Sequence, residues 1–229
     1  MPPSAAGELP QSPVPAGLIL AGGQSRRMGR DKAALPFGPE TLLARSVRHL
    51  AQVASPIVVS LAPGQTAHPA VGGAEVRFVR DEQAYGGPLP GMLHGFRALA
   101  ALHPAPRAVL LMPVDLPFYT PQWMRRALAG LAGHRVCLYR YGGFVNALVG
   151  AYEVALVSKL ERLAHEPRSR PLSLSDGEPT RVLDVEALWT EADGPPPLMD
   201  TDTPEDYEKA LALAGFGGSR GPLPPGHVK

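Results

Sequence analysis

The stretch that decides the fold is residues 18–32, which read Leu18-Ile19-Leu20-Ala21-Gly22-Gly23-Gln24-Ser25-Arg26-Arg27-Met28-Gly29-Arg30-Asp31-Lys32. It opens with a short apolar run of the kind that forms a buried strand. The paired glycines that follow carry no side chains, so a ligand can reach the backbone N–H groups there. Arg26, Arg27 and Lys32 add positive charge nearby, and these side chains suit phosphate oxygens. The stretch therefore predicts a strand followed at once by a phosphate-binding loop.

Two familiar phosphate-binding patterns do not fit this loop. The dinucleotide pattern G-x-G-x-x-G is absent, because Gly22-Gly23 is followed only by Gly29. The P-loop pattern G-x4-G-K-[ST] also fails, since five residues separate Gly23 from Gly29 and Arg30 comes next. The missing dinucleotide pattern argues against a dinucleotide-dependent oxidoreductase.

Strand-like and helix-like patterns alternate along the rest of the chain. This alternation predicts an α/β fold of Rossmann-like type: a mostly parallel sheet with helices on both faces, in three layers. We expect residues 135–200 to add an antiparallel edge and a substrate-facing lobe. The predicted strands cover residues 18–20, 57–59, 76–79, 108–112, 136–139, 145–152 and 182–185, and the helices 41–53, 92–102, 121–131, 155–164 and 204–213.

Composition at the two ends differs from that of the middle. Residues 1–15 hold five prolines and almost no aliphatic periodicity, which predicts a disordered lead-in. Residues 215–229 contain Gly-Gly and Pro-Pro without an apolar pattern, which predicts a flexible tail. Residues 16–214 are then expected to form a single domain.

Charge and cysteine content narrow the function classes. The formal net charge is +1, from 22 basic and 21 acidic residues, so we expect neither nucleic acid nor a membrane as a partner. No apolar run reaches the ~20 residues that span a bilayer, and no secretory signal pattern opens the chain. Cys137 is the only cysteine, which excludes an internal disulfide. A cytoplasmic protein is the expectation.

The loop and three later segments together resemble the molybdenum cofactor guanylyltransferase (MobA) family, within the sugar and cofactor nucleotidyltransferases. The later segments are Arg80-Asp81-Glu82 with Gly87-Pro88-Leu89-Pro90-Gly91-Met92, then Pro113-Val114-Asp115-Leu116-Pro117, then Asp200-Thr201-Asp202-Thr203-Pro204-Glu205-Asp206. The resemblance covers residues 18–214. It implies a fold of the nucleotide-diphospho-sugar transferase type, GTP and Mo-molybdopterin as substrates, Mg²⁺ as cofactor, and cofactor-insertion proteins or apo-molybdoenzymes as candidate partners.

Asp115 is the candidate metal ligand. It follows the apolar strand at 108–112, so it faces the same crevice as the first loop, and a carboxylate there suits Mg²⁺ shared with substrate phosphates. By resemblance it matches the family's metal-binding aspartate; the alternative is a plain turn residue. Asp202 is the second expected ligand, although Asp202 could instead only cap the helix after it. The family often has Asn at positions 200 and 202, which leaves the role of Asp200 open.

The expected nucleotide-binding residues surround the same crevice. Asp81 matches, by resemblance, an aspartate that contacts the nucleotide, and Ser60 stands where the family tends to have Asn. The glycines and prolines of residues 86–91 favour a wall against a flat base or pterin, with a turn that opens a helix as the alternative. The full predicted set is Leu20, Ala21, Gly22, Gly23, Lys32, Ser60, Asp81, Gly87 and Asp115.

These residues predict nucleotidyl transfer. A phosphate cradle, a metal-binding carboxylate and no evident base suit a nucleophile that is already ionised, such as a phosphate monoester that attacks the α-phosphorus of an NTP. Arg27, Lys32 and Asp115 are the predicted catalytic residues. By resemblance the reaction joins GMP to molybdopterin. The alternatives are CTP as donor, another phosphorylated acceptor, or a non-catalytic module that delivers the cofactor.

Overall fold

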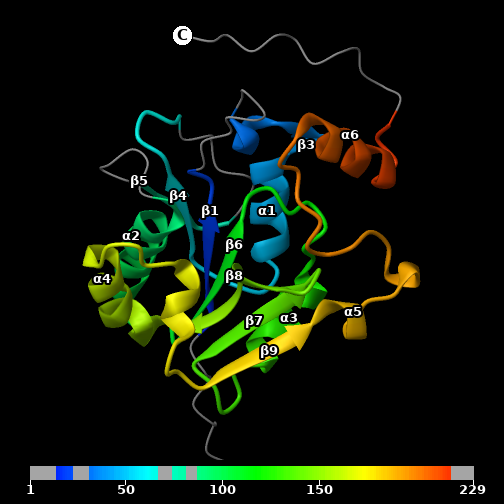
Figure 1. The fold of residues 1–229 in the computed structure, drawn as a ribbon. Coiled ribbons are helices and arrows are strands. Elements are labelled where there is room, and N and C mark those ends of the chain that lie inside the picture. Colours follow the sequence, from blue (N-terminus) through cyan, green and yellow to red (C-terminus); the bar gives the residue numbers. More distant parts are fainter. Residues whose placement is uncertain (1–13, 23–30, 67–73, 81–86, 218–229) are drawn as a thin grey trace, which may run out of the picture.

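The computed structural model describes residues 14–22, 31–66, 74–80 and 87–217. Seven of its strands form one mixed sheet in the order β5-β4-β1-β6-β8-β7-β9 (Figure 1). A separate two-stranded sheet pairs β2 with β3. The large sheet comprises β1 (Ala16–Leu20), β4 (Ile57–Leu61), β5 (Val76–Arg80), β6 (Ala108–Pro113), β7 (Val136–Tyr141), β8 (Phe144–Glu153) and β9 (Thr180–Asp184), and the small one β2 (Pro36–Phe37) and β3 (Glu40–Thr41).

The predicted mostly parallel sheet is confirmed, with one correction. Strands β5, β4, β1 and β6 pair in parallel, as do β7 and β9. Strand β8 runs antiparallel to both β6 and β7. The antiparallel strand expected at an edge therefore lies inside the sheet, because the tight β7–β8 hairpin at Gly142-Gly143 returns the chain between β6 and β7 rather than outside them.

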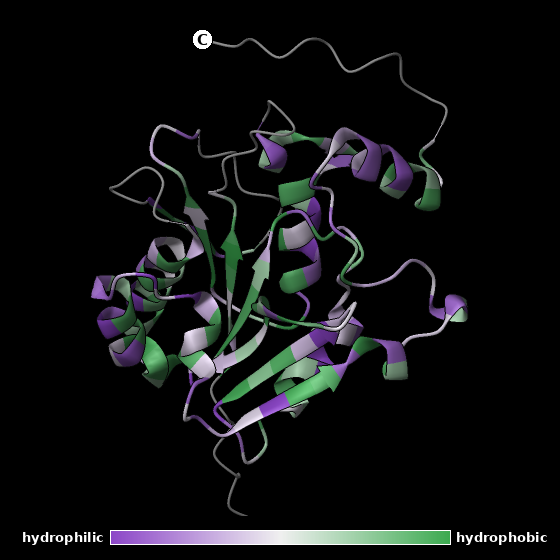
Figure 2. Cartoon of the chain, viewed as in Figure 1, coloured by the Kyte–Doolittle hydropathy of each residue, from purple (hydrophilic) through white to green (hydrophobic). Residues whose placement is uncertain are grey.

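Helices cover both faces of the sheet, as the alternating pattern predicted. Neighbouring strand residues point to opposite faces: Leu18 belongs to the hydrophobic cluster that includes residues of α2 and α4, whereas Ile19 belongs to the cluster that includes residues of α1 and α3. Figure 2 shows the central strands in the hydrophobic colour and hydrophilic residues on the outer helices. The α-helices are α1 (Leu42–Leu50), α2 (Pro88–Ala100), α3 (Pro121–Ala129), α4 (Val157–His165), α5 (Val185–Leu188) and α6 (Pro204–Leu213).

Helix α2 begins earlier than predicted. We expected the helix from residue 92, with residues 86–91 as a wall, but Pro88 already occupies the first helical position and Gly91 lies inside the helix. Prolines fit there because the first turn of a helix has no use for their missing N–H groups. Gly87 precedes the helix with φ of +71°, a conformation that favours glycine. The expected wall is therefore the first turn of α2.

Short elements complete the fold. They are the 3-10 helices η1 (Lys32–Ala34), η2 (Val154–Leu156), η3 (Pro171–Ser175) and η4 (Glu191–Asp193). Val185, expected at a strand end, starts α5 instead. Phe216, which the sequence placed in the tail, packs edge-on against Phe37 with ring centroids 5.6 Å apart, so packing continues past α6. Among the described residues no helix is long and apolar enough to cross a membrane.

Candidate active site

The candidate site lies where three neighbouring parallel strands end. Leu20 at the end of β1 is in register with Ser60 of β4 and with Pro113 of β6. The segments that leave these strands remain tied together, because the N–H of Val114 donates to the carbonyl of Leu20 at 3.1 Å. Open α/β sheets bind ligands at the carboxyl ends of their parallel strands, so this edge is the candidate ligand-binding site.

Lys32 joins two distant carboxylates at this edge. Its ammonium donates to Asp115 Oδ2 at 2.8 Å and to Asp202 Oδ1 at 2.5 Å. The side chains of Lys32 and Asp115 are 14% and 17% exposed, and that of Asp202 is 46% exposed. Asp115 and Asp202, which follow Lys32 by 83 and 170 positions in the chain, thus both bind its ammonium group. The ion pair between Lys32 and Asp115 is largely shielded from water.

The electrostatics of this cluster depend on burial and on opposite charge. Burial lowers the pKa of Lys32, but Asp115 and Asp202 outweigh it, so the pKa lies above its usual value. Burial raises the pKa of Asp115, and the nearby charge of Asp202 adds to this, while Lys32 acts in the opposite direction. Burial thus favours the neutral form of Asp115, and the neighbouring Lys32 ammonium favours the ionised form.

Asp202 does not take the helix-capping role that was its alternative. Thr203 is the N-cap of α6: its hydroxyl accepts from the N–H of Asp206, and the Asp206 carboxylate accepts from the N–H of Thr203 in return. The Asp202 carboxylate instead accepts from Lys32. Partial burial of its carboxyl group, and then the charges of Asp202 and Asp115, raise the pKa of Asp200. The residue as a whole is exposed.

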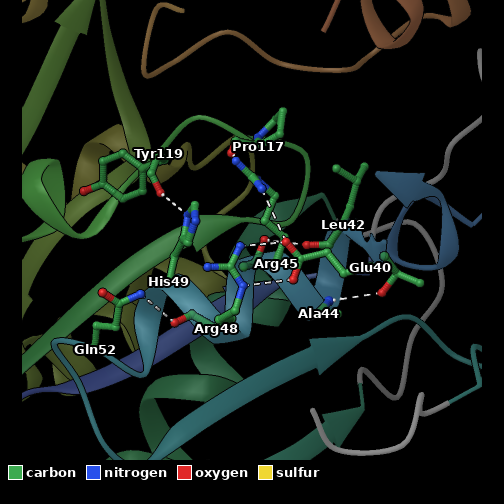
Figure 3. Close-up of polar contacts among 11 residues, drawn as sticks. Glu40, Leu42, Ala44, Arg45, Arg48, His49, Gln52, Pro117 and Tyr119 are labelled. Atoms are coloured by element: carbon green, nitrogen blue, oxygen red, sulfur yellow. Dashed lines mark hydrogen bonds and ion pairs between the residues drawn. The ribbon is translucent and has the colours of Figure 1, made fainter. Parts of the chain in front are cut away.

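Helix α1 holds the segment that carries Asp115. Arg45 Nε donates to the carbonyl of Pro117 at 2.7 Å, and His49 Nδ1 lies 3.3 Å from the carbonyl of Tyr119 (Figure 3). Ser46 shares its hydroxyl between the carbonyl of Leu42 at 2.9 Å and that of Val114 at 3.4 Å. Three side chains of one helix thus contact the backbone on both sides of Asp115, which fixes where its carboxylate lies.

The sequence of this chain is similar to those of known proteins. Residues 17–179 match the family described as MobA-like NTP transferase domain. The chain belongs to this family. A Mycobacterium avium protein named "Probable molybdenum cofactor guanylyltransferase" is 40% identical over 152 residues, which are 65% of this chain and 74% of that protein.

Solved structures share the fold of this MobA-like domain. Molybdopterin-guanine dinucleotide biosynthesis protein A from Archaeoglobus fulgidus superposes with a TM-score of 0.69 at 18% identity, over 87% of this chain and 98% of that one. The Mycobacterium tuberculosis protein Rv0371C, solved as a complex with manganese, superposes with a TM-score of 0.60 at 25% identity, over 88% of this chain and all of that one. The nucleotidyltransferase fold predicted from the sequence is confirmed.

Packing in the MobA-like domain leaves no room for a side chain at Gly22. A Cβ atom built on it would meet the backbone N of Ala62 at 2.6 Å and the carbonyl carbon of Leu61 at 2.8 Å. Any side chain would therefore push the segment after β1 away from the segment after β4. Ala21, one residue earlier, is 4% exposed and donates its N–H to the carbonyl of Ser60 at 2.9 Å.

The structure brings some of the predicted site residues together and leaves others undescribed. Lys32, Asp115 and Asp202 are in direct contact, and Leu20, Ala21, Gly22 and Ser60 lie at the adjoining strand ends. The Ser60 side chain is 1% exposed. Gly87 is exposed at the start of α2. Three predicted residues lie outside the described part of the chain: Gly23, Arg27 and Asp81.

The donor set of this edge fits a magnesium ion. Two carboxylates already hold one cation, the Lys32 ammonium, between them. In the described ranges no group of three or more His, Cys, Asp and Glu side chains is arranged to hold a metal. Mg²⁺ in phosphate-transferring enzymes is commonly bound by one or two carboxylates plus water and substrate phosphates, so two carboxylates suffice.

Sequence reasoning missed the residues that support the site. Arg45, Ser46 and Thr201 contact the backbone of the Asp115 segment, and only Thr201 lies in a segment that the sequence analysis singled out. The sequence contained only a weak indication of their role, because Ser46 and His49 are polar residues on the apolar face of a predicted helix. Both are buried in the structure. Buried polar groups need partners, which is how such residues could have been singled out.

Proposed function

We propose that this protein transfers GMP from GTP to the terminal phosphate of Mo-molybdopterin, giving molybdopterin guanine dinucleotide and pyrophosphate. The observation that carries the proposal is the Lys32 ammonium held between Asp115 and Asp202 at the carboxyl edge of the sheet. The family of NTP transferases supplies the reaction type. The name of the 40% identical Mycobacterium avium protein supports guanine as the base and the molybdenum cofactor as the product.

The reaction needs no general base. An oxygen of the acceptor phosphate, already ionised at neutral pH, forms a bond to the α-phosphorus of GTP. The bond from that phosphorus to the bridging oxygen of the β-phosphate breaks, and the electron pair leaves with pyrophosphate. What the protein must supply is position and charge stabilisation. That need agrees with a cluster made of one ammonium and two carboxylates.

Each residue of the chain then has a distinct task. Lys32 and Arg27 bind the triphosphate and offset the charge that builds on the leaving pyrophosphate. The backbone N–H groups of Gly22 and Gly23 are the proposed donors to the phosphates. Asp115 and Asp202 would hold Mg²⁺, which would supply positive charge to offset that of the phosphates. The manganese complex of the Mycobacterium tuberculosis relative supports a divalent cation in this role.

Lys32 has two sets of partners in this scheme. In the protein alone its ammonium binds Asp115 and Asp202. With a divalent cation at the carboxylates, the Lys32 ammonium would be available to donate to phosphate oxygens, which are strong acceptors. Lys32 is the first residue of η1, which lies at the same edge of the sheet as Gly22.

Pyrophosphate release tests the proposal. Purified protein is incubated with Mg²⁺ and GTP, CTP or ATP, each with and without molybdopterin. We expect release that requires both GTP and molybdopterin, together with formation of the dinucleotide. A preference for CTP would leave nucleotidyl transfer standing and overturn the guanine assignment. Binding of GTP with no product from any acceptor would favour a delivery module and overturn the enzymatic proposal.

A further inference from the structure

Gln65 lies in the turn that leaves β4, next to the candidate site. Its main-chain N–H donates to the carbonyl of Ala62 at 3.2 Å, and its side-chain Oε1 accepts from the N–H of Ala62 at 2.9 Å. The guanidinium of Arg80 donates to the carbonyl of Gln65. Gly64, with φ of +76°, provides the turn. Two of these contacts hold the main chain of Gln65, and the third holds its side-chain oxygen.

The amide of Gln65 connects the two ends of the glycine-rich stretch. Its Nε2 donates to the carbonyl of Ala21 at 3.1 Å and to Asp31 Oδ1 at 2.8 Å. Ala21 follows β1 directly, and Asp31 immediately precedes Lys32. A glutamine amide has two N–H donors, and here one is used at each end of the stretch. Gln65 therefore sets the separation between residues 21 and 31.

Asp31 links Gln65 to Lys32, because it caps the short helix that begins at Lys32. The same oxygen, Asp31 Oδ1, accepts from the N–H of Ala33 at 3.0 Å, so Asp31 is the N-cap of η1. Lys32 is the first residue of that helix, and its ammonium reaches Asp115 and Asp202. Moving Asp31 would rotate η1 and displace the ammonium from the carboxylates.

We propose that Gln65 is a positioning residue of the nucleotide site, which acts through its contacts with Ala21 and Asp31 to place Lys32 for the triphosphate. The inference rests on the proposed function in taking this edge as the triphosphate site, and it is independent of which base is bound. No oxygen of the substrate has to touch Gln65. Its effect is on the spacing of the groups that do.

The decisive variant is Gln65→Glu. It keeps the length of the side chain and the acceptor for the Ala62 N–H, but it removes both donors and places a carboxylate against Asp31 and the Ala21 carbonyl. We expect titration calorimetry with GTP and Mg²⁺ to give a dissociation constant about tenfold higher than that of the wild type. Turnover, measured as pyrophosphate release, should fall together with affinity, because the same groups hold the leaving group.

A second substitution separates positioning from general stability. When Gln65→Glu is combined with Asp31→Asn, the carboxylate introduced at position 65 no longer faces a second negative charge, while the side-chain oxygen at position 31 can still accept from the Ala33 N–H. We expect this double variant to bind GTP at least about threefold more tightly than Gln65→Glu alone, since a direct contact couples the two changes. The remaining deficit measures the lost contact with Ala21. Gln65→Met, which keeps the side-chain length without hydrogen bonds, should also bind GTP more weakly.

The matched control is Gln52→Glu. Gln52 follows α1, where its exposed amide donates to the Arg48 carbonyl at 3.2 Å (Figure 3). This control should bind GTP as the wild type does. A Gln65→Glu dissociation constant within twofold of the wild type, even with a lowered melting temperature, would overturn the inference. So would a double variant that binds no better than Gln65→Glu.

Failure of the proposed function gives a different result. If the wild type prefers CTP or makes no dinucleotide, the guanylyltransferase proposal falls, and the same comparison of variants is made with the nucleoside triphosphate that the wild type binds best. A wild type that binds no nucleoside triphosphate overturns both proposals.

Discussion

Thr201 donates twice to the main-chain carbonyl of Asp115, with its N–H at 3.1 Å and its hydroxyl at 3.3 Å. Thr201 is fully buried and stands directly before Asp202. These two contacts tie the backbone of one candidate metal ligand to the backbone of the other. The carboxylates of Asp115 and Asp202 are therefore held near one another even without a cation, which lowers the cost of bringing them together on binding.

Thr201→Val should raise the Mg²⁺ concentration needed for half-maximal turnover by about fivefold. The substitution keeps the shape of the side chain and the N–H contact but loses one hydrogen bond, worth about 1 kcal/mol. Turnover against Mg²⁺ concentration is the measurement. Thr201→Ser, which keeps the hydroxyl, is the control and should resemble the wild type. Equal Mg²⁺ dependence in Thr201→Val and the wild type would contradict the prediction.

Asp115→Asn should reduce turnover by about 10²-fold or more, the size of loss seen when one electrostatic stabiliser is removed. The variant keeps the size of the side chain and removes its charge, so circular dichroism should show a folded protein. Pyrophosphate release at limiting Mg²⁺ is the measurement. Wild-type turnover in this variant would mean that Asp115 is not a metal ligand.

Lys32→Ala should weaken GTP binding by about tenfold or more, because a charge-assisted contact with phosphate is lost. Calorimetry gives the affinity, and pyrophosphate release should fall with it. Lys159→Ala is the matched control, since Lys159 binds Glu178 and the Asp176 carbonyl on another part of the surface. Unchanged affinity in Lys32→Ala would assign the triphosphate to other residues.

Asp81→Ala should reduce the preference for GTP over CTP and ATP, which we expect to be about 10²-fold or more in the wild type. Guanine presents N1–H and N2–H₂ donors, and an ionised carboxylate only accepts, so the two are complementary. Competition of the three nucleotides in one assay measures the preference. A preference that survives intact in Asp81→Ala would place base recognition on other groups.

Much of the fold was predictable because it depends on local pattern. The apolar runs at 57–59 and 108–112 became β4 and β6, since a strand buried on both faces is apolar throughout. The prolines before Met92 were misleading, because the same residues suit a rigid wall and the first turn of a helix. The two-residue strands β2 and β3 are too short to show any period.

The candidate site was predictable only in its charged residues. Lys32, Asp115 and Asp202 stand in recognisable motifs, and the structure brings them into contact. The role of Thr201 could not be predicted, since it depends on a contact between residues 86 positions apart. The same holds for Arg45, whose partner Pro117 is 72 positions away. Such contacts are determined by how the elements pack.

His49 should make stability depend on pH in weakly acidic solution. Burial, and next the charge of Arg45, lowers its pKa from 6.5 to about 4. Between these two values the unfolded chain binds a proton that the folded chain does not, so this contribution to stability is complete above pH 6.5 and is lost as the pH falls toward 4. The loss is at most about 1.4 kcal/mol per pH unit.

Comparison with His49→Gln isolates this contribution. The variant removes the titrating group, so the advantage of the wild type in unfolding free energy should shrink as the pH is lowered from 7.5 to 4.5. Urea unfolding at several pH values is the measurement, and acid effects common to both proteins cancel in the difference. Parallel stability curves for the two proteins would show that His49 titrates alike when folded and unfolded.

The separation of Lys32 and Asp202 along the chain has a consequence for how the protein is made. Residues 17–179, the span that matches the family, contain Lys32 and Asp115 but not Asp202. At about 5–20 residues per second, the 170 positions from Lys32 to Asp202 take roughly 8 to 34 seconds to translate. A nascent chain thus presents its lysine and first aspartate well before the second carboxylate leaves the ribosome. The full charge cluster can assemble only after Asp202 has been translated.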